Sequence, residues 1–216
     1  MAATSLEDAL SRLDASIEVD VSYQEVDDDG VAKLTQALKT NHTIVDIYLD
    51  DNKITDKGVQ LFAELMEYSR TLRQISFYHN LVTDAGVKSL SKALVASSLN
   101  LLDLRENRVS DAGATALAEA LEDGSQLRFL LLKDNEITDD GAQRLAAAVK
   151  KCGEDGPLQQ LDLESNRITA KGSVYLKEVK ESLKKEIQFG YQKSKAREQH
   201  RGVIDSHSKD GVFAAR

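Results

Sequence analysis

The sequence is poor in several residue types, and each scarcity excludes a class of protein. Its 216 residues include one cysteine, so an internal disulfide framework is impossible and a reducing compartment is expected. Tryptophan is absent and proline occurs once. No apolar run approaches the ~18 residues of a membrane span, and the N-terminus lacks the apolar core of a signal peptide. We therefore expect a cytoplasmic protein that does not bind membranes.

Positive charge and catalytic motifs are also scarce. The net charge of −8 argues against a nucleic-acid partner. The four histidines are scattered, and phosphate-binding glycine loops and nucleophile elbows are missing. The run from Glu25 to Gly30 loosely imitates a calcium loop, but Gln36 stands where a bidentate acid is needed, and Cys152 has no activating neighbour in the sequence. We expect a protein that is not an enzyme and that needs no cofactor or metal.

The chain does contain a repeat of about 28 residues, which is clearest in residues 99–121, LNLLDLRENRVSDAGATALAEAL. Leu102 and Leu104 are separated by one residue, so on a strand both would face the same interior. Asn107 follows, and its amide can satisfy backbone groups of a turn. Gly113 then opens a stretch with the period of an amphipathic helix.

The same columns recur along most of the chain. The Leu102 column contains Val19, Ile47, Ile75, Leu130, Leu161 and Ile187, and the Leu104 column contains Val21, Leu49, Phe77, Leu132, Leu163 and Phe189. The Asn107 column contains Gln24, Asn52, Asn80, Asn135, Asn166 and Gln192, and the Gly113 column contains Gly30, Gly58, Gly86, Gly141 and Gly172. Such agreement over many repeats predicts a solenoid.

A Thr-Asp or Ser-Asp pair precedes most of the glycines and predicts a helix N-terminus, because the hydroxyl can cap the helix and the carboxylate complements its dipole. Ala170 breaks this pattern in the last full repeat. Residues 5–14 predict an amphipathic helix that covers the first repeat. Residues 150–159 read as a surface loop that contains the proline and Cys152.

These patterns predict an α/β fold, a right-handed leucine-rich repeat solenoid in the shape of a horseshoe arc. Parallel strands would form its concave face and helices its convex face. We assign residues 1–15 to an N-terminal capping helix, 16–192 to about six repeats with a terminal strand, and 193–216 to a basic helix and tail. We expect a monomer, with one elongated domain.

Three segments give the repeats a family resemblance: NKITDKG at 52–58, NRVSDAG at 107–113 and NEITDDG at 135–141. They resemble the leucine-rich repeats of the ribonuclease-inhibitor type. The small number of repeats and the segment IQFGYQ at 187–192 are similar to the C-terminal domain of tropomodulin and leiomodin. That resemblance implies binding to the pointed end of actin filaments. The N-terminal tropomyosin-binding helices of that family have no counterpart here.

The outward strand positions form three rows that we name after one member each. The Tyr48 row contains Asp20, Tyr48, Ser76, Asp103, Leu131 and Asp162; the Tyr78 row contains Ser22, Asp50, Tyr78, Arg105, Lys133 and Glu164; the His79 row contains Tyr23, Asp51, His79, Glu106, Asp134 and Ser165. Tyrosine and arginine are enriched in binding hot spots. We predict a partner-binding site of Tyr23, Tyr48, Tyr78, His79, Arg105, Phe129, Leu131, Lys133, Tyr191 and Lys193.

The predicted function is a non-enzymatic protein-interaction module that binds through this concave face and the C-terminal cap, with actin or another cytoskeletal protein as partner. One alternative is a regulator of a small GTPase, similar to the Ran GTPase activator, although the longer array and acidic tail of that family are absent. Another is an enzyme inhibitor of the ribonuclease-inhibitor type. That family is rich in cysteine, whereas this chain has only Cys152.

Overall fold

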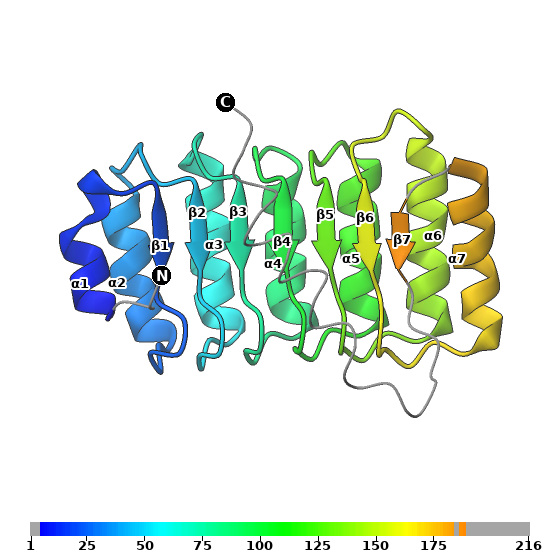
Figure 1. Cartoon of the computed structure of the whole chain (residues 1–216), viewed down its shortest axis with the longest axis horizontal. Coiled ribbons are helices and arrows are strands. Elements are labelled where there is room, and N and C mark those ends of the chain that lie inside the picture. The colour runs from blue at the N-terminus through cyan, green and yellow to red at the C-terminus, as the bar shows by residue number, and fades with distance from the viewer. Residues whose placement is uncertain (1–4, 184–185, 189–216) are drawn as a thin grey trace.

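A computed structural model describes residues 5–183 and 186–188 of the chain. Their strands form one open, seven-stranded sheet in chain order, and helices alternate with the strands (Figure 1). The strands are β1 (Glu18–Asp20), β2 (Asp46–Tyr48), β3 (Gln74–Ser76), β4 (Leu101–Asp103), β5 (Phe129–Leu131), β6 (Gln160–Asp162) and β7 (Glu186–Gln188). The helices are α1 (Leu6–Ser11), α2 (Asp28–Leu38), α3 (Asp56–Tyr68), α4 (Asp84–Leu94), α5 (Asp111–Glu122), α6 (Asp139–Cys152) and α7 (Ala170–Leu183), and a 3₁₀ turn spans Leu13–Ala15.

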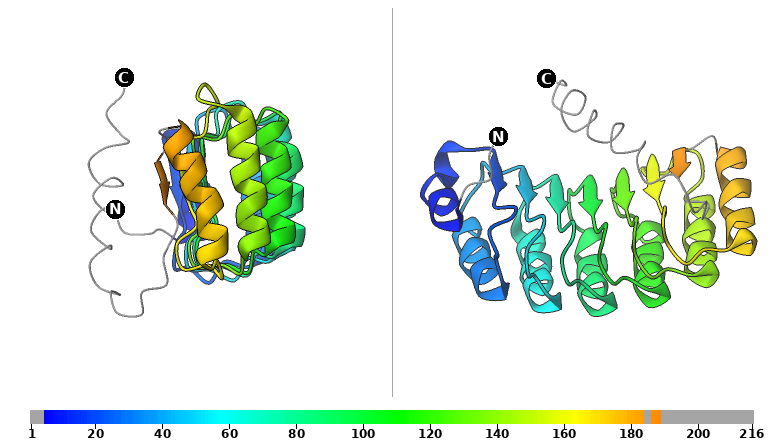
Figure 2. Two further views of the ribbon diagram at one scale, coloured as in Figure 1. Left: turned by 90° about the vertical axis from the view of Figure 1, so that its right-hand side faces the viewer. Right: turned by 60° about the horizontal axis from the view of Figure 1, so that its bottom comes forward.

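The two layers form a curved solenoid. The helices lie on one side of the sheet and are spread more widely than the strands, so the strands form the concave face (Figure 2). Every neighbouring pair of strands is parallel, and the predicted alignment is confirmed from Val19, which pairs with Ile47, to Leu161, which pairs with Ile187. Among the described residues, no helix is long and apolar enough to cross a membrane.

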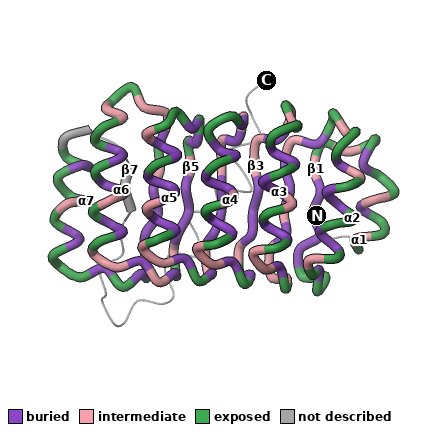
Figure 3. Tube along the Cα trace, turned by 180° about the vertical axis from the view of Figure 1, so that it is seen from behind, coloured by how far each residue is buried: buried purple, intermediate pink, exposed green. Residues whose placement is uncertain are grey.

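The core lies between the strands and the helices, and the buried residues of each helix face the sheet (Figure 3). Leu104 and its equivalents from Val21 to Leu163 are completely buried, as their column predicts, whereas Phe189 lies outside the described residues. Phe62 of α3 packs edge-on against Phe77, with 5.3 Å between ring centroids. The interior is therefore continuous from repeat to repeat rather than divided into separate cores.

Asparagine side chains join each repeat to the one before it. The Asn107 amide donates to the Phe77 carbonyl of the preceding repeat (2.8 Å) and to the Leu104 carbonyl of its own (3.2 Å). Its Oδ1 accepts the Val82 N–H at 2.9 Å. Asn52, Asn80, Asn135 and Asn166 bridge in the same way. This asparagine ladder satisfies turn groups that would otherwise be buried without partners.

Aspartates at the helix starts form a second ladder, which the sequence did not reveal. We expected each aspartate to complement the dipole of its own helix, but its carboxylate also reaches the following repeat. Asp56 accepts from the Thr83 N–H (2.8 Å), the Thr83 hydroxyl (2.6 Å) and the Gly86 N–H (3.0 Å). A Cβ on Gly86 would lie 2.6 Å from Asp56 Oδ1, so any larger residue here would displace the carboxylate from its hydrogen bonds. Ala170 has no such acceptor, and the ladder stops where Asp139 meets Thr169.

The boundaries at both ends differ in detail from the prediction. Ser5 caps α1 by accepting the Asp8 N–H, but the helix ends at Ser11 and a 3₁₀ turn follows. Ala9 of α1 is buried, which agrees with a helix that covers the first repeat. Cys152 is the last residue of α6 rather than part of the following loop. The helix assigned to residues 193–201 lies outside the described residues.

Truncation of one leucine tests the core. Leu104→Ala removes a fully buried side chain and should lower the free energy of unfolding by about 2–5 kcal/mol. Urea denaturation followed by circular dichroism measures the change. Glu119→Ala, on the exposed side of α5, is the control and should change stability by less than about 0.5 kcal/mol. A small loss for Leu104→Ala would contradict a continuous core.

The aspartate ladder can be tested separately. Asp56→Ala leaves three donors of the next repeat without their acceptor and should cost about 1–3 kcal/mol. Asp56→Asn keeps one carbonyl oxygen and should cost less. Asp140→Ala, which removes an exposed acid from the first turn of α6, controls for the helix dipole. Equal losses for Asp56→Ala and Asp140→Ala in the same denaturation experiment would exclude a cross-repeat role.

Candidate protein-binding face

The concave face is the side of the sheet opposite the helices (Figure 2). Residues two apart on each short strand point to this face, because side chains alternate on a strand. The Tyr48 row lies on the strands themselves and the Tyr78 row directly beyond their ends. A further row, which the sequence analysis did not single out, is formed at the strand starts by Glu18, Asp46, Gln74, Leu101, Phe129 and Gln160.

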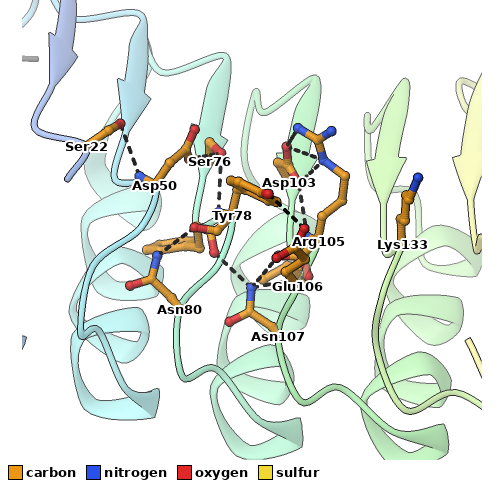
Figure 4. Close-up of polar contacts among 12 residues, drawn as sticks. Ser22, Asp50, Ser76, Tyr78, Asn80, Asp103, Arg105, Glu106, Asn107 and Lys133 are labelled. Atoms are coloured by element: carbon orange, nitrogen blue, oxygen red, sulfur yellow. Dashed lines mark hydrogen bonds and ion pairs between the residues drawn. The ribbon is translucent and has the colours of Figure 1, made fainter. Parts of the chain in front are cut away.

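Tyr78 and Arg105 form the best-ordered polar cluster on this face (Figure 4). The Arg105 guanidinium lies 5.1 Å from the centre of the Tyr78 ring and binds Asp103 through Nε (2.9 Å) and Nη2 (2.6 Å). The Tyr78 hydroxyl donates to Glu106 at 2.8 Å. Burial and this bond to Glu106 raise the pKa of Tyr78, so the phenol stays protonated. The cluster holds two predicted binding residues in fixed positions.

Buried carboxylates flank this cluster on the side of β1 and β2. Asp50 accepts a short hydrogen bond from the Ser76 hydroxyl, and its N–H donates to Ser22 Oγ at 3.2 Å. Burial raises the pKa of Asp50 to about 6. Asp46 is only 4% exposed, and burial together with the nearby Glu18 carboxylate raises its pKa to about 6. Sequence reasoning missed both acids as site residues, although the Asp50 position was visible in the Tyr78 row.

The His79 row adopts a backbone conformation that the sequence did not indicate. All six residues have positive φ angles between 51° and 61°, a left-handed conformation that is uncommon for residues other than glycine. His79 and Asp51 of adjacent repeats form a short ion-pair contact. The hydrogen bond to Asp51 raises the pKa of His79. The row therefore forms an exposed ridge beside the Tyr78 row, and Tyr23 lies at its start with 68% of its surface exposed.

The C-terminal half of the face combines apolar and charged side chains. Leu131 lies between Asp103 and Asp162 of the neighbouring strands and is 6% exposed, so it offers a partner far less surface than we expected. Phe129 is half-buried, with Arg128 5.8 Å from its ring centre. Lys133 binds Glu164 at 2.7 Å. These residues adjoin the Tyr78 cluster through Asp103, which pairs with Leu131 across the strands and binds Arg105.

The structure places the predicted site residues as follows. Tyr78, His79 and Arg105 lie together, because the Tyr78 and His79 ring centres are 6.1 Å apart. Tyr48 lies on β2, toward the N-terminal end of the same face. Tyr191 and Lys193 lie outside the described residues. In the part of the chain that the structure describes, no group of three or more histidine, cysteine or acidic side chains is arranged to hold a metal ion.

Comparisons with known proteins agree with this architecture. The family model described as Leucine Rich repeat matches residues 40–63, 95–118, 126–146 and 157–176. No curated protein matches the sequence. The solved structure "Leiomodin-1 Actin-Binding Site 2 (ABS2)" is 16% identical with a TM-score of 0.57, over 69% of this chain and 90% of that one. The tropomodulin C-terminal domain of Caenorhabditis elegans is 18% identical with a TM-score of 0.58, over 68% and 93%. Likeness at such low identity establishes a shared fold.

The buried carboxylates predict a specific pH dependence. Asp46 has a folded pKa near 6, above its ordinary value of 3.8, so the folded protein takes up a proton first as the pH falls. The free energy of unfolding should therefore rise from pH 7 to pH 5. Asp46→Asn mimics the protonated form, so this variant should be more stable than the parent at pH 7 and should show a smaller rise.

Thermal unfolding of both proteins at half-unit pH steps measures this difference. Asp50 and His79 also favour the folded state as the pH falls, and both remain in the variant, so the difference between the two curves reports Asp46. Parallel curves would show that Asp46 titrates at its ordinary pKa.

Proposed function

We propose that this chain, which folds as a leucine-rich repeat solenoid, is a non-enzymatic module that binds a protein partner through its concave face. The observation that carries the proposal is that Tyr78, Arg105 and Lys133 occupy one row across successive repeats, beside Tyr48 of the neighbouring row, on a face that no described helix covers. Extended concave faces of solenoids are suited to proteins rather than to small molecules. The aromatic and guanidinium groups are those of interface hot spots.

The partner that we propose is actin, in the cytoplasm. Two observations support this choice: the fold shared with leiomodin and tropomodulin domains, one of which is named for an actin-binding site, and the IQFGYQ segment at 187–192. Tyr191 and Lys193, in and just after that segment, belong to the proposal as contacts from the C-terminal cap. The other proposed contacts are Tyr23, His79, Phe129 and Leu131, of which Leu131 would contribute the least area.

Loss of two tyrosines tests the concave face. Tyr48→Ala combined with Tyr78→Ala should weaken actin binding about tenfold or more, because large aromatic contacts carry much of the energy of an interface. Neither residue belongs to the fully buried core, so the melting temperature should change little. Co-sedimentation with filaments and elongation of pointed ends, with barbed ends blocked, measure the binding.

Tyr68→Ala is the matched control, since Tyr68 ends α3 on the helical side and is 69% exposed. It should leave binding unchanged. If the double variant binds as well as the parent, the concave face is not the binding site. If the unmodified protein has no effect on filaments at micromolar concentration, actin is not the partner.

A further inference from the structure

Five side chains at the N-terminal end of the concave face form a group that we call the Tyr48 site: Glu18, Asp20, Asp46, Tyr48 and Asp50. Glu18 pairs with Asp46, and Asp20 pairs with Tyr48, across β1 and β2. Asp50 follows β2 by two residues. Because alternate strand residues share a face, four carboxylates surround one phenol on the same side of the sheet.

Most carboxylates of this site have hydrogen-bond partners, since Asp50 accepts from the Ser76 hydroxyl and Gln74 forms a side-chain hydrogen bond with Asp46, but one oxygen is left without a partner within the described chain. Asp46 Oδ1 is buried and has no hydrogen-bond partner among the described residues. Burial first, and then the charges of Asp46, Glu18, Asp50 and Asp20, raise the pKa of Tyr48. Arg105 is the base that acts on the site, and it lowers the pKa of Asp50 without a direct hydrogen bond to it, since its own guanidinium is bound to Asp103. The site is therefore a half-buried concentration of negative charge, with Asp46 at its base.

The neighbouring Tyr78 cluster shows how the same chemistry is satisfied when a cation is present. There the chain supplies Arg105, which lies over the tyrosine ring and binds a carboxylate through two nitrogens. Such an arrangement combines a cation–π contact with charge-assisted hydrogen bonds. The Tyr48 site has the ring and more carboxylates, and the charged groups that act on Tyr48 besides its burial are all carboxylates.

We propose that the Tyr48 site receives a lysine or arginine side chain of the protein partner, with its cation over the Tyr48 ring and against Asp50, while the charge of the buried Asp46 attracts it from beneath. The inference rests on the proposed protein-binding function and specifies the chemistry of the partner. A side-chain cation fits better than a metal ion, because calcium needs six or more converging oxygens and no such group is found in the described residues. The partner segment is thus basic where it meets β1 and β2.

A defined peptide tests this chemistry without knowledge of the partner. The probe is an acetylated and amidated peptide of alternating arginine, glycine and serine, titrated into the full-length chain by calorimetry and by NMR of the tyrosine rings. We expect saturable binding that shifts the Tyr48 resonances more than those of Tyr68. The same peptide with glutamate in place of arginine should not bind. Binding of both peptides, or shifts that are equal at the two tyrosines, would overturn the proposal.

Two matched double variants separate the site from overall charge. Asp46→Asn with Asp50→Asn should weaken peptide binding about tenfold. Glu64→Gln with Glu67→Gln makes the same change in net charge on the exposed side of α3, in the same repeat, and should change binding less than about twofold. If the two variants weaken peptide binding equally, the peptide is held only by long-range attraction to the net negative charge of the protein, and the proposal is overturned.

The outcome is also distinguishable from that of the proposed function. If the parent protein binds filaments and the Asp46→Asn, Asp50→Asn variant binds them equally well, the Tyr48 site is not the contact and the inference fails alone. If filaments are not bound but the arginine peptide binds at Tyr48, actin fails as the partner and the cation site stands. Circular dichroism of each variant verifies that it is folded.

Discussion

The structure depends on hydrogen bonds to the backbone N–H and C=O groups in the turns between stacked coils. A solenoid of short strands has few ladder hydrogen bonds per repeat, and each turn after a strand leaves N–H and C=O groups close to the core. Asn107 and its equivalents supply both a donor and an acceptor, and they direct them to the preceding repeat. A buried backbone group without a hydrogen-bond partner costs about 1–3 kcal/mol. One asparagine per repeat therefore contributes a large share of the small net free energy of unfolding.

The aspartate ladder adds direction to this arrangement. Each carboxylate reaches forward to the following repeat, whereas each asparagine reaches back to the preceding one, so a coil is held on both sides by side chains of its neighbours. The repeats consequently keep one register, and the outward side chains of adjacent strands lie about 4.8 Å apart. A binding face built on this frame has fixed spacing between its polar groups, which reduces the entropy that must be lost on binding.

The concave face carries a cost in stability. Asp46 and Asp50 have pKa values raised by burial, so at neutral pH their charged forms oppose folding. Neutral side chains at these positions would make a more stable protein. Such local costs are common where a surface is shaped for binding rather than for folding. The two carboxylates that oppose folding lie on β2 and in the turn after it, in the same repeat as Tyr48.

Most of the fold could be predicted from the sequence because each column of the repeat has one physical role. The pairing of Leu102 with Leu130 follows from alignment alone, and the structure confirms it. The left-handed conformation of His79 could not be predicted, because nothing in a histidine requires it and the turn imposes it. The burial of Leu131 depends on neighbouring strands, which a single strand does not reveal. The forward reach of Asp56 likewise depends on a residue 27 positions away.

Ala170 has a consequence for the assembly of longer arrays. Asp111, at the start of α5, accepts hydrogen bonds from Thr138, which precedes α6. A coil inserted between α5 and α6 could therefore use the same carboxylate and continue the aspartate ladder. A coil that followed α7 would meet a methyl group instead of a carboxylate, so the N–H and hydroxyl donors at the start of its helix would lack the acceptor that the earlier repeats supply. Ala170→Asp would restore that acceptor in the last full coil.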